Sequence, residues 1–594
     1  MRMVRAWCLG LLALPLPLYA QTNIRYELTF DTVTARQRSL HVTMRFDVGS
    51  AAPVQVSLPA WTPGAYEISN YARKVSNFSA TAAGHAAVWD KSDYDTWRIR
   101  PTAAGPISLG FDFLADTLDN AMAWSKPDFL LVNGTNVFPY PEGIGLGFPA
   151  QVTVTTTPGW RVLTGMERAP QGASSYQAGN YHDLVDMPFF IGRFDLDSTQ
   201  IDGTWQRLAS YPAGQLKGPA RDILWKQLRG FTPAEAAVFG ETPWKNYSTM
   251  LIFDPGYGGG SALEHQSSHV GIYTPGFIGT PLLASITAHE MFHSWNVKRL
   301  RPADMVPYRY DQPEETTLLW VSEGITDYYA DLALVRGGVI DSTVFLSVTD
   351  GKRQHTDETV PVSLEDASLS TWIHPTDGTA DIYYDKGSLA GLLLDILIRD
   401  ASDNHKSLDD VMRGLYQTSY KAGKGFTTAE WWAAVSAAAG GKSFAEFATK
   451  YVEGREPFPW TSLGPLAGLQ YLVDSNQVVR LGVNTISDSS KVIVTAVTPQ
   501  SAAEAAGVEP GDQLVRIGDI DVKDENFGVL FRSRYANAVG SVIPIVVHRN
   551  DADKILQATI KRELVVTARL LYDPRASARA ARIRNGILKG TTDK

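Results

Sequence analysis

One five-residue segment, His289-Glu290-Met291-Phe292-His293, constrains the fold of this chain more than any other feature. Residues four apart on an α-helix lie on one face, so the two imidazoles can share a metal ion if this segment is helical. Glu290 then lies beside the ion, where its carboxylate can take a proton from water. Thr280 and Pro281 are residue types that begin helices, and a helix that begins there would include His289 and His293. We therefore expect a helix that carries two zinc ligands, rather than two hydrogen-bonded core histidines.

A catalytic zinc site needs a third protein ligand and leaves its fourth position to water. No third histidine follows at the short spacing of H-E-x-x-H-x-x-G-x-x-H. The next candidates lie in residues 318–329, LLWVSEGITDYY, where Glu323 and Asp327 are one helical turn apart. Glu323 is the candidate third ligand, and Asp327 is the candidate acceptor for the free ring nitrogen of a zinc-bound histidine. The competing interpretation is an exposed pair of helix carboxylates.

The hydrophobic periodicity divides the chain into parts. Apolar and polar residues alternate with period two from Tyr26 to Asp47 and in several later segments, so residues 21–200 are predicted to be an all-β domain. Residues 201–462 have mainly helical spacing, and strands return over 463–566. Residues 567–594 are rich in basic side chains and are expected to be a solvated tail or a short capping helix. The predicted fold class is multidomain α+β.

The first part of the chain has the composition of a cleaved secretory signal. Arg2 and Arg5 precede an apolar stretch over residues 6–18. That stretch is shorter than the ~20 residues that span a bilayer, which disfavours a membrane anchor. We expect residues 1–20 to be removed, and the mature protein to be periplasmic or secreted. The only cysteine, Cys8, leaves with the signal, so the exported chain must fold without disulfides.

Charge and hydropathy exclude two classes of partner. Lys and Arg total 54 against 63 Asp and Glu, which gives a formal net charge of −9. No long basic run interrupts the body of the chain, and an acidic surface repels phosphates, so nucleic acid is not an expected partner. No segment after the signal is apolar for long enough to span a bilayer, so we expect no stable membrane insertion once the signal is cleaved.

The segment 499–518, PQSAAEAAGVEPGDQLVRIG, has a distinctive order of signals. A short alanine-rich helix ends at Gly507, and the turn Pro510-Gly511-Asp512 leads into an apolar strand. This order resembles the PDZ domain that is appended to bacterial exported proteases. The resemblance implies peptide C-termini as partners, which such a domain adds as a strand to its sheet, with Leu481-Gly482-Val483 in its carboxylate loop.

The histidine motif and its surroundings resemble one peptidase family. Residues 289–302, HEMFHSWNVKRLRP, followed by WVSEGITDYY, are similar to the glycyl aminopeptidase family of gluzincin zinc peptidases. That family carries a β domain, a thermolysin-like catalytic domain, here 201–462, and a PDZ domain. In the wider group, which includes aminopeptidase N, a glutamate on a later helix is the third zinc ligand, and this falls on Glu323. The resemblance implies one Zn²⁺ per chain and a preference for N-terminal glycine or alanine.

Two further segments resemble motifs of this wider group. Residues 384–387, YDKG, are similar to Y-E-K-G, whose tyrosine hydroxyl stabilises the oxyanion. Residues 258–265, GGGSALEH, resemble G-x-M-E-N, whose strand lies along the substrate and whose glutamate binds the free α-amine. Core tyrosines and a surface-loop glutamate are the competing interpretations. The implied site residues are Tyr384, with Tyr383 as the alternative, and Glu264 with Gly259 and Gly260.

The sequence thus predicts an exported zinc aminopeptidase in which Glu290 acts as general base on a zinc-activated water. Its substrates are peptides with a free N-terminus. Two alternatives remain: a periplasmic zinc endopeptidase whose PDZ domain recruits substrates, and a non-catalytic peptide-binding scaffold. Glu290 argues against the scaffold, because a structural zinc site has no use for this carboxylate.

Overall fold

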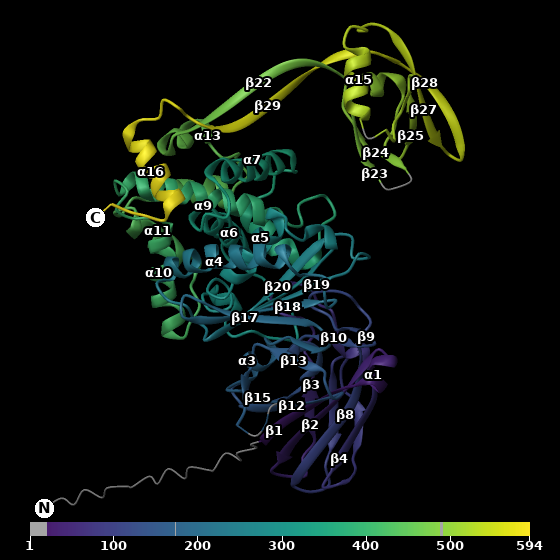
Figure 1. Ribbon diagram of the computed structural model, residues 1–594, viewed down its shortest axis with the longest axis vertical. Helices are drawn as coiled ribbons and strands as arrows, with labels where there is room; N and C mark the ends of the chain where they lie inside the picture. The colour runs from purple at the N-terminus through teal and green to yellow at the C-terminus, as the bar shows by residue number, and fades with distance from the viewer. Residues whose placement is uncertain (1–20, 171, 173, 488–490, 525, 594) are drawn as a thin grey trace, which may run out of the picture. The chain divides into compact units, whose positions relative to one another are not determined.

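The computed structural model describes residues 21–170, 172, 174–487, 491–524 and 526–593 (Figure 1). The predicted signal and Cys8 lie outside these residues. The chain forms two compact units. One comprises the residues up to Leu469 together with Asp573–Lys594, and the other is Gln470–Tyr572. The predicted fold class, multidomain α+β, is confirmed by an N-terminal all-β domain, a mainly helical domain and a C-terminal β region.

Three sheets build the N-terminal β domain, the largest with eight strands in the order β14-β15-β12-β1-β2-β8-β4-β5. In β2 and β8, alternate residues are buried, as the period of two requires. The run from Tyr26 to Asp47 is two antiparallel strands separated by a short helix. The elements are β1 (Thr22–Phe30), α1 (Thr32–Arg36), β2 (Ser39–Val48), β3 (Val54–Ser57), η1 (Tyr71–Lys74), β4 (Val75–Ala82), β5 (His85–Ala86), β6 (Val88–Lys91), β7 (Thr96–Arg100), β8 (Gly105–Leu114), β9 (Trp124–Lys126), β10 (Phe129–Val132), α2 (Gly134–Val137), β11 (Tyr140–Pro141), β12 (Ala150–Thr156), β13 (Arg161–Thr164), β14 (Glu167–Arg168), β15 (Ser175–Ala178), α3 (Tyr181–Val185) and β16 (Phe189–Gly192).

A five-stranded sheet opens the second part of the chain, in the order β17-β18-β19-β21-β20. From residue 201 onward the spacing predicts mainly helices, but four of these strands lie within residues 204–273, on both sides of α4 (Pro219–Phe239). The physical reason is burial on both faces: all six residues of β21 are buried, so no alternation marks the strand. β20 lies at the edge of the sheet. The strands are β17 (Asp195–Ile201), β18 (Thr204–Tyr211), β19 (Asn246–Phe253), β20 (Gly260–His265) and β21 (Ser268–Tyr273).

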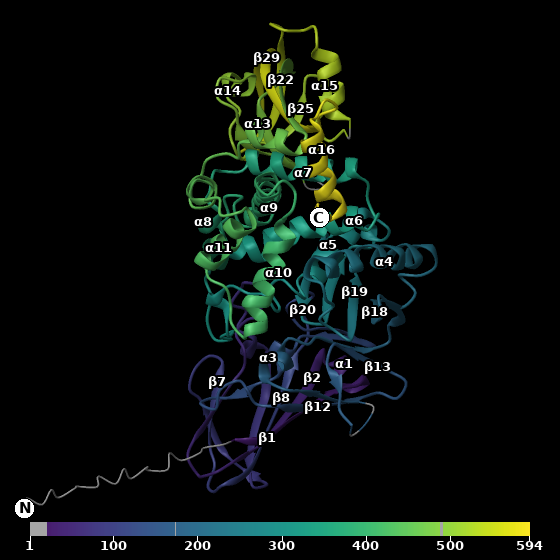
Figure 2. The same cartoon turned by 90° about the vertical axis from the view of Figure 1, so that its left-hand side faces the viewer.

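Helices cover one face of this sheet, as Figure 2 shows from the side. Helix α5 packs between the sheet, α4 and α6, and α6 packs in turn on α9. The elements are α4 (Pro219–Phe239), η2 (Pro275–Phe277), α5 (Pro281–Phe292), η3 (Ala303–Met305), η4 (Trp320–Gly324), α6 (Ile325–Arg336), α7 (Ser342–Glu358), α8 (Leu364–Ser370), η5 (Thr371–Ile373), α9 (Ile382–Ala401), α10 (Leu408–Thr418), η6 (Tyr420–Ala422), α11 (Thr428–Ala438), α12 (Ala445–Phe447), η7 (Ala448–Val452), α13 (Trp460–Leu463) and η8 (Gly464–Ala467).

The end of the chain returns to the first unit. Helix α16 (Ala578–Lys589) buries Ile583 and Ile587 against α6 and α9. Arg399 Nη1 donates a hydrogen bond to the carbonyl of Thr591 at 2.8 Å. Of the two expectations for residues 567–594, the short helix is present as α16, which packs because one face of it is apolar, and the solvated tail is not. The first residues of this segment complete strand β29.

The second unit has the elements expected of the PDZ segment. Helix α14 ends at Gly507 in the left-handed conformation (φ +81°), and strand β25 follows the turn. The unit begins at Gln470 and ends at Tyr572, so it starts seven residues later and ends six residues later than the predicted 463–566. Its elements are β22 (Leu469–Arg480), β23 (Val483–Ser487), β24 (Val492–Val497), α14 (Ala502–Ala506), β25 (Gln513–Ile517), β26 (Ile520–Asp521), α15 (Phe527–Tyr535), β27 (Val542–Arg549), β28 (Ala552–Thr559) and β29 (Lys561–Tyr572).

Among the described helices, none has the length and hydropathy that crossing a bilayer requires.

Candidate metal centre

Helix α5 carries His289 in its last turn, and its C-cap residue, His293, lies on the same face. Its start is the one predicted: Thr280 is the N-cap, its hydroxyl accepts a hydrogen bond from the Leu283 amide at 3.3 Å, and Pro281 follows. The Nε2 atoms of His289 and His293 lie 2.9 Å apart. The helical spacing therefore brings the two rings to one point, as the sequence predicts.

The outer nitrogens of the two rings face acceptors. His293 Nδ1 lies 2.9 Å from the carbonyl oxygen of Asn296. Since a carbonyl only accepts, Nδ1 carries the proton and Nε2 keeps its lone pair in the neutral ring. His289 Nδ1 lies 3.8 Å from Asp327 Oδ1, so the Asp327 carboxylate faces His289 as the Asn296 carbonyl faces His293. Both rings are thus oriented to present Nε2 to the same site.

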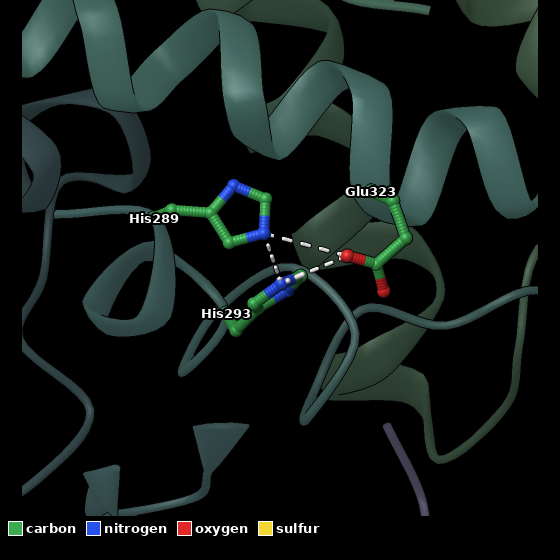
Figure 3. Close-up of side chains that lie close together, drawn as sticks. All are labelled: His289, His293 and Glu323. Carbon is green, nitrogen blue, oxygen red and sulfur yellow. Dashed lines mark hydrogen bonds and ion pairs between the residues drawn. The ribbon is translucent and has the colours of Figure 1, made fainter. Parts of the chain in front are cut away.

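Glu323 completes this group from a second segment. Its Oε2 lies 3.1 Å from His293 Nε2 and 3.4 Å from His289 Nε2 (Figure 3). One ligand atom from each of the three residues can be chosen so that all lie within 4.8 Å of one another. Among the described residues, this is the only group of three or more His, Cys, Asp or Glu side chains that meets this condition.

Glu323 projects from η4, a π-helical turn at the start of α6. Such turns insert an extra residue into a helix and recur at functional sites. A Cβ on Gly324 would lie 2.5 Å from the Gly387 Cα, so both glycines are needed for this close approach of η4 and α9. Asn296 Nδ2 donates to the Val321 carbonyl at 2.8 Å, which ties the end of α5 to the same turn.

The electrostatics of the group favour positive charge at its centre. Burial lowers the pKa of His289, but the carboxylates of Asp327 and Glu323 outweigh it and raise this pKa to about 10. Burial raises the pKa of Glu323, but His293 and His289 reverse this and hold it well below its usual range. Three electron-pair donors therefore converge where a cation is stabilised.

The donor set fits zinc. Two imidazole nitrogens and one carboxylate oxygen form a His₂Glu set, which is a known ligand set of catalytic zinc. Tetrahedral ligands at zinc's usual bond lengths of about 2.0–2.1 Å are about 3.4 Å apart. The three distances between these atoms, 2.9, 3.1 and 3.4 Å, are close to that value.

Glu290 lies beside the group with one oxygen unengaged. Its side chain is buried, and Oε2 has no hydrogen-bond partner among the described residues. Burial raises the pKa of this carboxyl to about 7, although His289 and His293 oppose the rise. A carboxyl with a pKa near neutrality can both accept and return a proton.

The two adjacent tyrosines differ in their contacts. The ring of Tyr384 lies 5.7 Å from that of His289, centroid to centroid. The hydroxyl of Tyr383 lies 3.2 Å from Thr371 Oγ1 and is engaged there. Of the two, Tyr384 is therefore the one beside the histidines.

Glu264 lies on the edge strand β20, which begins at Gly260, and Gly259 precedes it. It is 4% exposed, and its Oε1 lies 3.5 Å from Lys298 Nζ. That lysine donates to Asp186 Oδ1 at 2.9 Å. Glu264 is therefore part of a buried charge cluster and is not a surface-loop glutamate.

Sequence reasoning missed three residues that touch this site. Lys352 of α7 pairs with Asp327, and with Asp331 Oδ2 at 2.5 Å, so it neutralises the carboxylate behind His289. Lys298 lies within the family-like segment 289–302, and its position five residues after His293 is the available signal. The third is Tyr66 of the N-terminal domain, whose hydroxyl donates to Glu323 Oε1 at 2.6 Å.

Three stretches of the chain match known families. Residues 25–193 match the Peptidase M61 N-terminal domain, residues 283–390 match M61 glycyl aminopeptidase, and residues 479–560 match the PDZ domain. The resemblance that the motifs indicated is thereby confirmed. No curated protein matches the chain.

Comparison with solved structures shows one likeness of fold over nearly the whole chain. An aminopeptidase N family protein from Idiomarina loihiensis superimposes with a TM-score of 0.83 at 21% sequence identity, over 95% of this chain and 100% of that chain. A variant of the M1 zinc metallopeptidase from Deinococcus radiodurans reaches a TM-score of 0.48 at 14% identity, over 74% of this chain and 96% of that chain. The first of these likenesses is one of fold alone.

Proposed function

We propose that this zinc aminopeptidase, which carries the N-terminal and glycyl aminopeptidase domains of the M61 peptidases, removes N-terminal glycine or alanine from peptides. The observation that carries the proposal is the convergence of His289 Nε2, His293 Nε2 and Glu323 Oε2, with the Glu290 carboxyl beside them. The preference for glycine is supported by the description of the matching family, glycyl aminopeptidase, and its extension to alanine by the sequence resemblance alone.

His289, His293 and Glu323 would hold one Zn²⁺ per chain. When bound, zinc lowers the pKa of a coordinated water toward ~7 and polarises the scissile carbonyl. Glu290 accepts the proton of the attacking water and later donates it to the leaving amine. Its buried position and its raised pKa support this double role, because the ideal proton acceptor has a pKa near the working pH.

Tyr384 donates a hydrogen bond to the oxygen of the scissile carbonyl as negative charge develops there. Its ring lies beside that of His289, whereas the Tyr383 hydroxyl is engaged with Thr371. Burial raises the pKa of Tyr384 well above its ordinary value, so the hydroxyl keeps its proton and remains a donor.

Glu264 binds the free α-amine of the substrate. Two buried carboxylates, Glu264 and Asp186, lie around the single ammonium of Lys298, so an α-ammonium group would supply a further positive charge. The free edge of β20, from Gly259 and Gly260 onward, offers backbone groups that can pair with the substrate backbone.

The remaining parts of the proposal rest on sequence. Residues 1–20 support export to the periplasm or secretion, with removal of this segment. The match of residues 479–560 to the PDZ domain supports a second binding site for peptide C-termini.

Cleavage of amino-acid p-nitroanilides tests the proposal. Glycine and alanine anilides, each with a free and with an acetylated amine, are assayed before and after chelation and after zinc is restored. An aminopeptidase cleaves the free-amine substrates and loses this activity with the metal. Cleavage of blocked peptides alone would favour the endopeptidase, and no cleavage of either would favour the scaffold.

Glu264→Gln tests the amine anchor. A lost hydrogen bond between charged groups costs about 1.5–3 kcal/mol, so kcat/KM for free-amine substrates should fall roughly 10- to 100-fold. Glu314→Gln removes an equally buried carboxyl elsewhere and serves as the control. If kcat/KM for free-amine substrates fell no further in Glu264→Gln than in Glu314→Gln, the assignment of the anchor would be wrong.

A further inference from the structure

A loop of the N-terminal domain reaches the metal centre. This loop, residues 58–70, joins β3 to η1 and makes four hydrogen bonds to the catalytic domain. The Ala60 amide donates to the Tyr310 carbonyl at 2.6 Å, and Trp61 Nε1 donates to the Arg309 carbonyl at 2.8 Å. The Pro63 carbonyl accepts from Lys298 at 3.0 Å, and the Tyr66 hydroxyl donates to Glu323.

Tyr66 acts on one oxygen of Glu323 and leaves the other to the histidines. Its hydroxyl donates to Oε1 at 2.6 Å, while Oε2 lies 3.1 and 3.4 Å from the two Nε2 atoms. A carboxylate held in this way can rotate little about its last bond. The ligand oxygen is therefore fixed before any ion binds, which is how hydrogen-bond partners of metal ligands raise metal affinity.

The tyrosine itself is held firmly. Its ring packs against Trp372 of the catalytic domain with centroids 6.1 Å apart at 85°, and Trp372 also contacts Trp61 at 5.0 Å. The Tyr66 side chain is buried. Ring and hydroxyl thus have contacts on the catalytic domain, although the residue belongs to the N-terminal domain.

The backbone of Tyr66 is in the left-handed region, with φ +49°. A bulky side chain adopts this conformation at a cost of about 1 kcal/mol or more. Residues in such conformations gather at functional sites, where the surrounding structure enforces them. The two amides of Ser69 and Asn70 donate to the Ala60 carbonyl at 2.8 Å and close the loop around Tyr66.

We propose that Tyr66 is a positioning residue of the metal centre, so that the N-terminal domain supplies part of the zinc site. This rests on the proposed function in one respect, that His289, His293 and Glu323 hold zinc. The chemistry is a neutral phenol that orients a carboxylate ligand, and its loss should weaken metal binding without unfolding the protein.

Tyr66→Phe removes only the hydroxyl and tests the proposal in the full-length protein. The dissociation constant for Zn²⁺ is measured by competition with a chromogenic chelator, and the visible absorption is recorded after Co²⁺ is substituted. We expect zinc affinity to fall roughly 10- to 100-fold, the usual effect of losing such a partner. The cobalt bands should also shift, which loss of packing alone does not cause.

Tyr71→Phe is the matched control. Tyr71 is fully buried, and its hydroxyl lies 2.5 Å from Thr62 Oγ1 in the same loop, away from the ligands. Thermal unfolding of the metal-free proteins reports any effect on folding. Unchanged zinc affinity and cobalt spectrum in Tyr66→Phe, or equal losses in both variants, would overturn the proposal.

These outcomes are separable from failure of the proposed function. A wild-type protein that binds zinc but cleaves no anilide would contradict the aminopeptidase, while the affinity measurement would still decide the role of Tyr66. A wild-type protein that binds no zinc would overturn both.

Discussion

Lys298 Nζ lies 2.9 Å from Asp186 Oδ1, and this buried ion pair joins the catalytic domain to the N-terminal domain. Glu264 Oε1 lies 3.5 Å from the same ammonium group. Although burial alone would raise the pKa of Asp186, the charge of Lys298 holds it well below its usual range. One lysine thus stabilises two carboxylates, one from each domain.

Lys298→Met should destabilise the protein strongly. It leaves two buried carboxylates without their ammonium partner, and breaking a buried ion pair from one side costs about 3–5 kcal/mol. The free energy of unfolding in urea measures this. Lys245→Met removes an exposed lysine that pairs with Glu167 at the surface, and it should stay within about 0.5 kcal/mol of wild type. Similar values for the two variants would contradict a structural role for the Lys298 cluster.

Glu290→Ala should abolish turnover while the zinc stays bound. The expected fall in kcat is at least about 100-fold, the lower range of the contribution of a general base. The zinc content of the purified variant is measured beside its activity. Substantial activity in a zinc-loaded variant would refute the assignment of Glu290 as the proton acceptor.

Gly64→Ala should impair binding of free-amine substrates. Gly64 has φ +108°, and a Cβ at this position would lie 2.5 Å from Glu264 Oε1. The carboxylate must then move, and we expect KM for free-amine anilides to rise about tenfold, the effect of about 1.4 kcal/mol. Gly84→Ala is the matched control, since Gly84 has φ +82° with nothing within 4 Å of its Cβ. Equal changes in KM would show that backbone strain alone is responsible.

His269 should make the protein sensitive to mild acid. Burial lowers the pKa of its imidazole to about 3, against about 6.5 in an unfolded chain. Between these values the unfolded chain binds a proton that the folded chain does not, so stability falls as the pH drops below about 6.5. At pH 5 the loss amounts to about 2 kcal/mol.

His269→Gln removes this titration and isolates the effect. Between pH 7 and pH 5 the wild-type protein should lose about 2 kcal/mol more of its unfolding free energy than the variant does. His405→Gln, which alters an exposed histidine, gives the background. A difference that stays constant with pH would mean that the folded protein accepts a proton on His269.

The local parts of the site could be predicted from the sequence, and the distant parts could not. His289 and His293 are four residues apart on a helix whose start is marked, so their geometry follows from the helical period. Glu323 and Asp327, one helical turn apart in an apolar segment, could be named as candidates from their spacing, although the π-helical turn itself has no sequence signal. Tyr66 is 257 residues before Glu323, and a tyrosine in a Gly/Pro loop carries no pattern that points to a metal ligand.

The fold shows the same division. The β domain was predictable because strands such as β2 and β8 bury alternate residues. Strands β19 and β21 lie inside a sheet that is covered on both faces, which removes the period of two, so only their short apolar runs, 249–253 and 270–273, indicate strands. In α16, by contrast, Ala580, Ile583 and Ile587 are spaced on one face, so its burial could have been recognised.

The Asp573 amide donates a hydrogen bond to the Gly468 carbonyl at 2.9 Å, so the chain departs from the first unit and rejoins it at neighbouring points. Residues 470–572 are thus a domain inserted into the first unit, because residues on both sides of them belong to that unit. A shortened enzyme should therefore be made by deleting residues 470–572 and joining Leu469 to Asp573. Truncation before residue 470 would also remove α16, whose Ile583 and Ile587 are buried against α6 and α9 in the first unit.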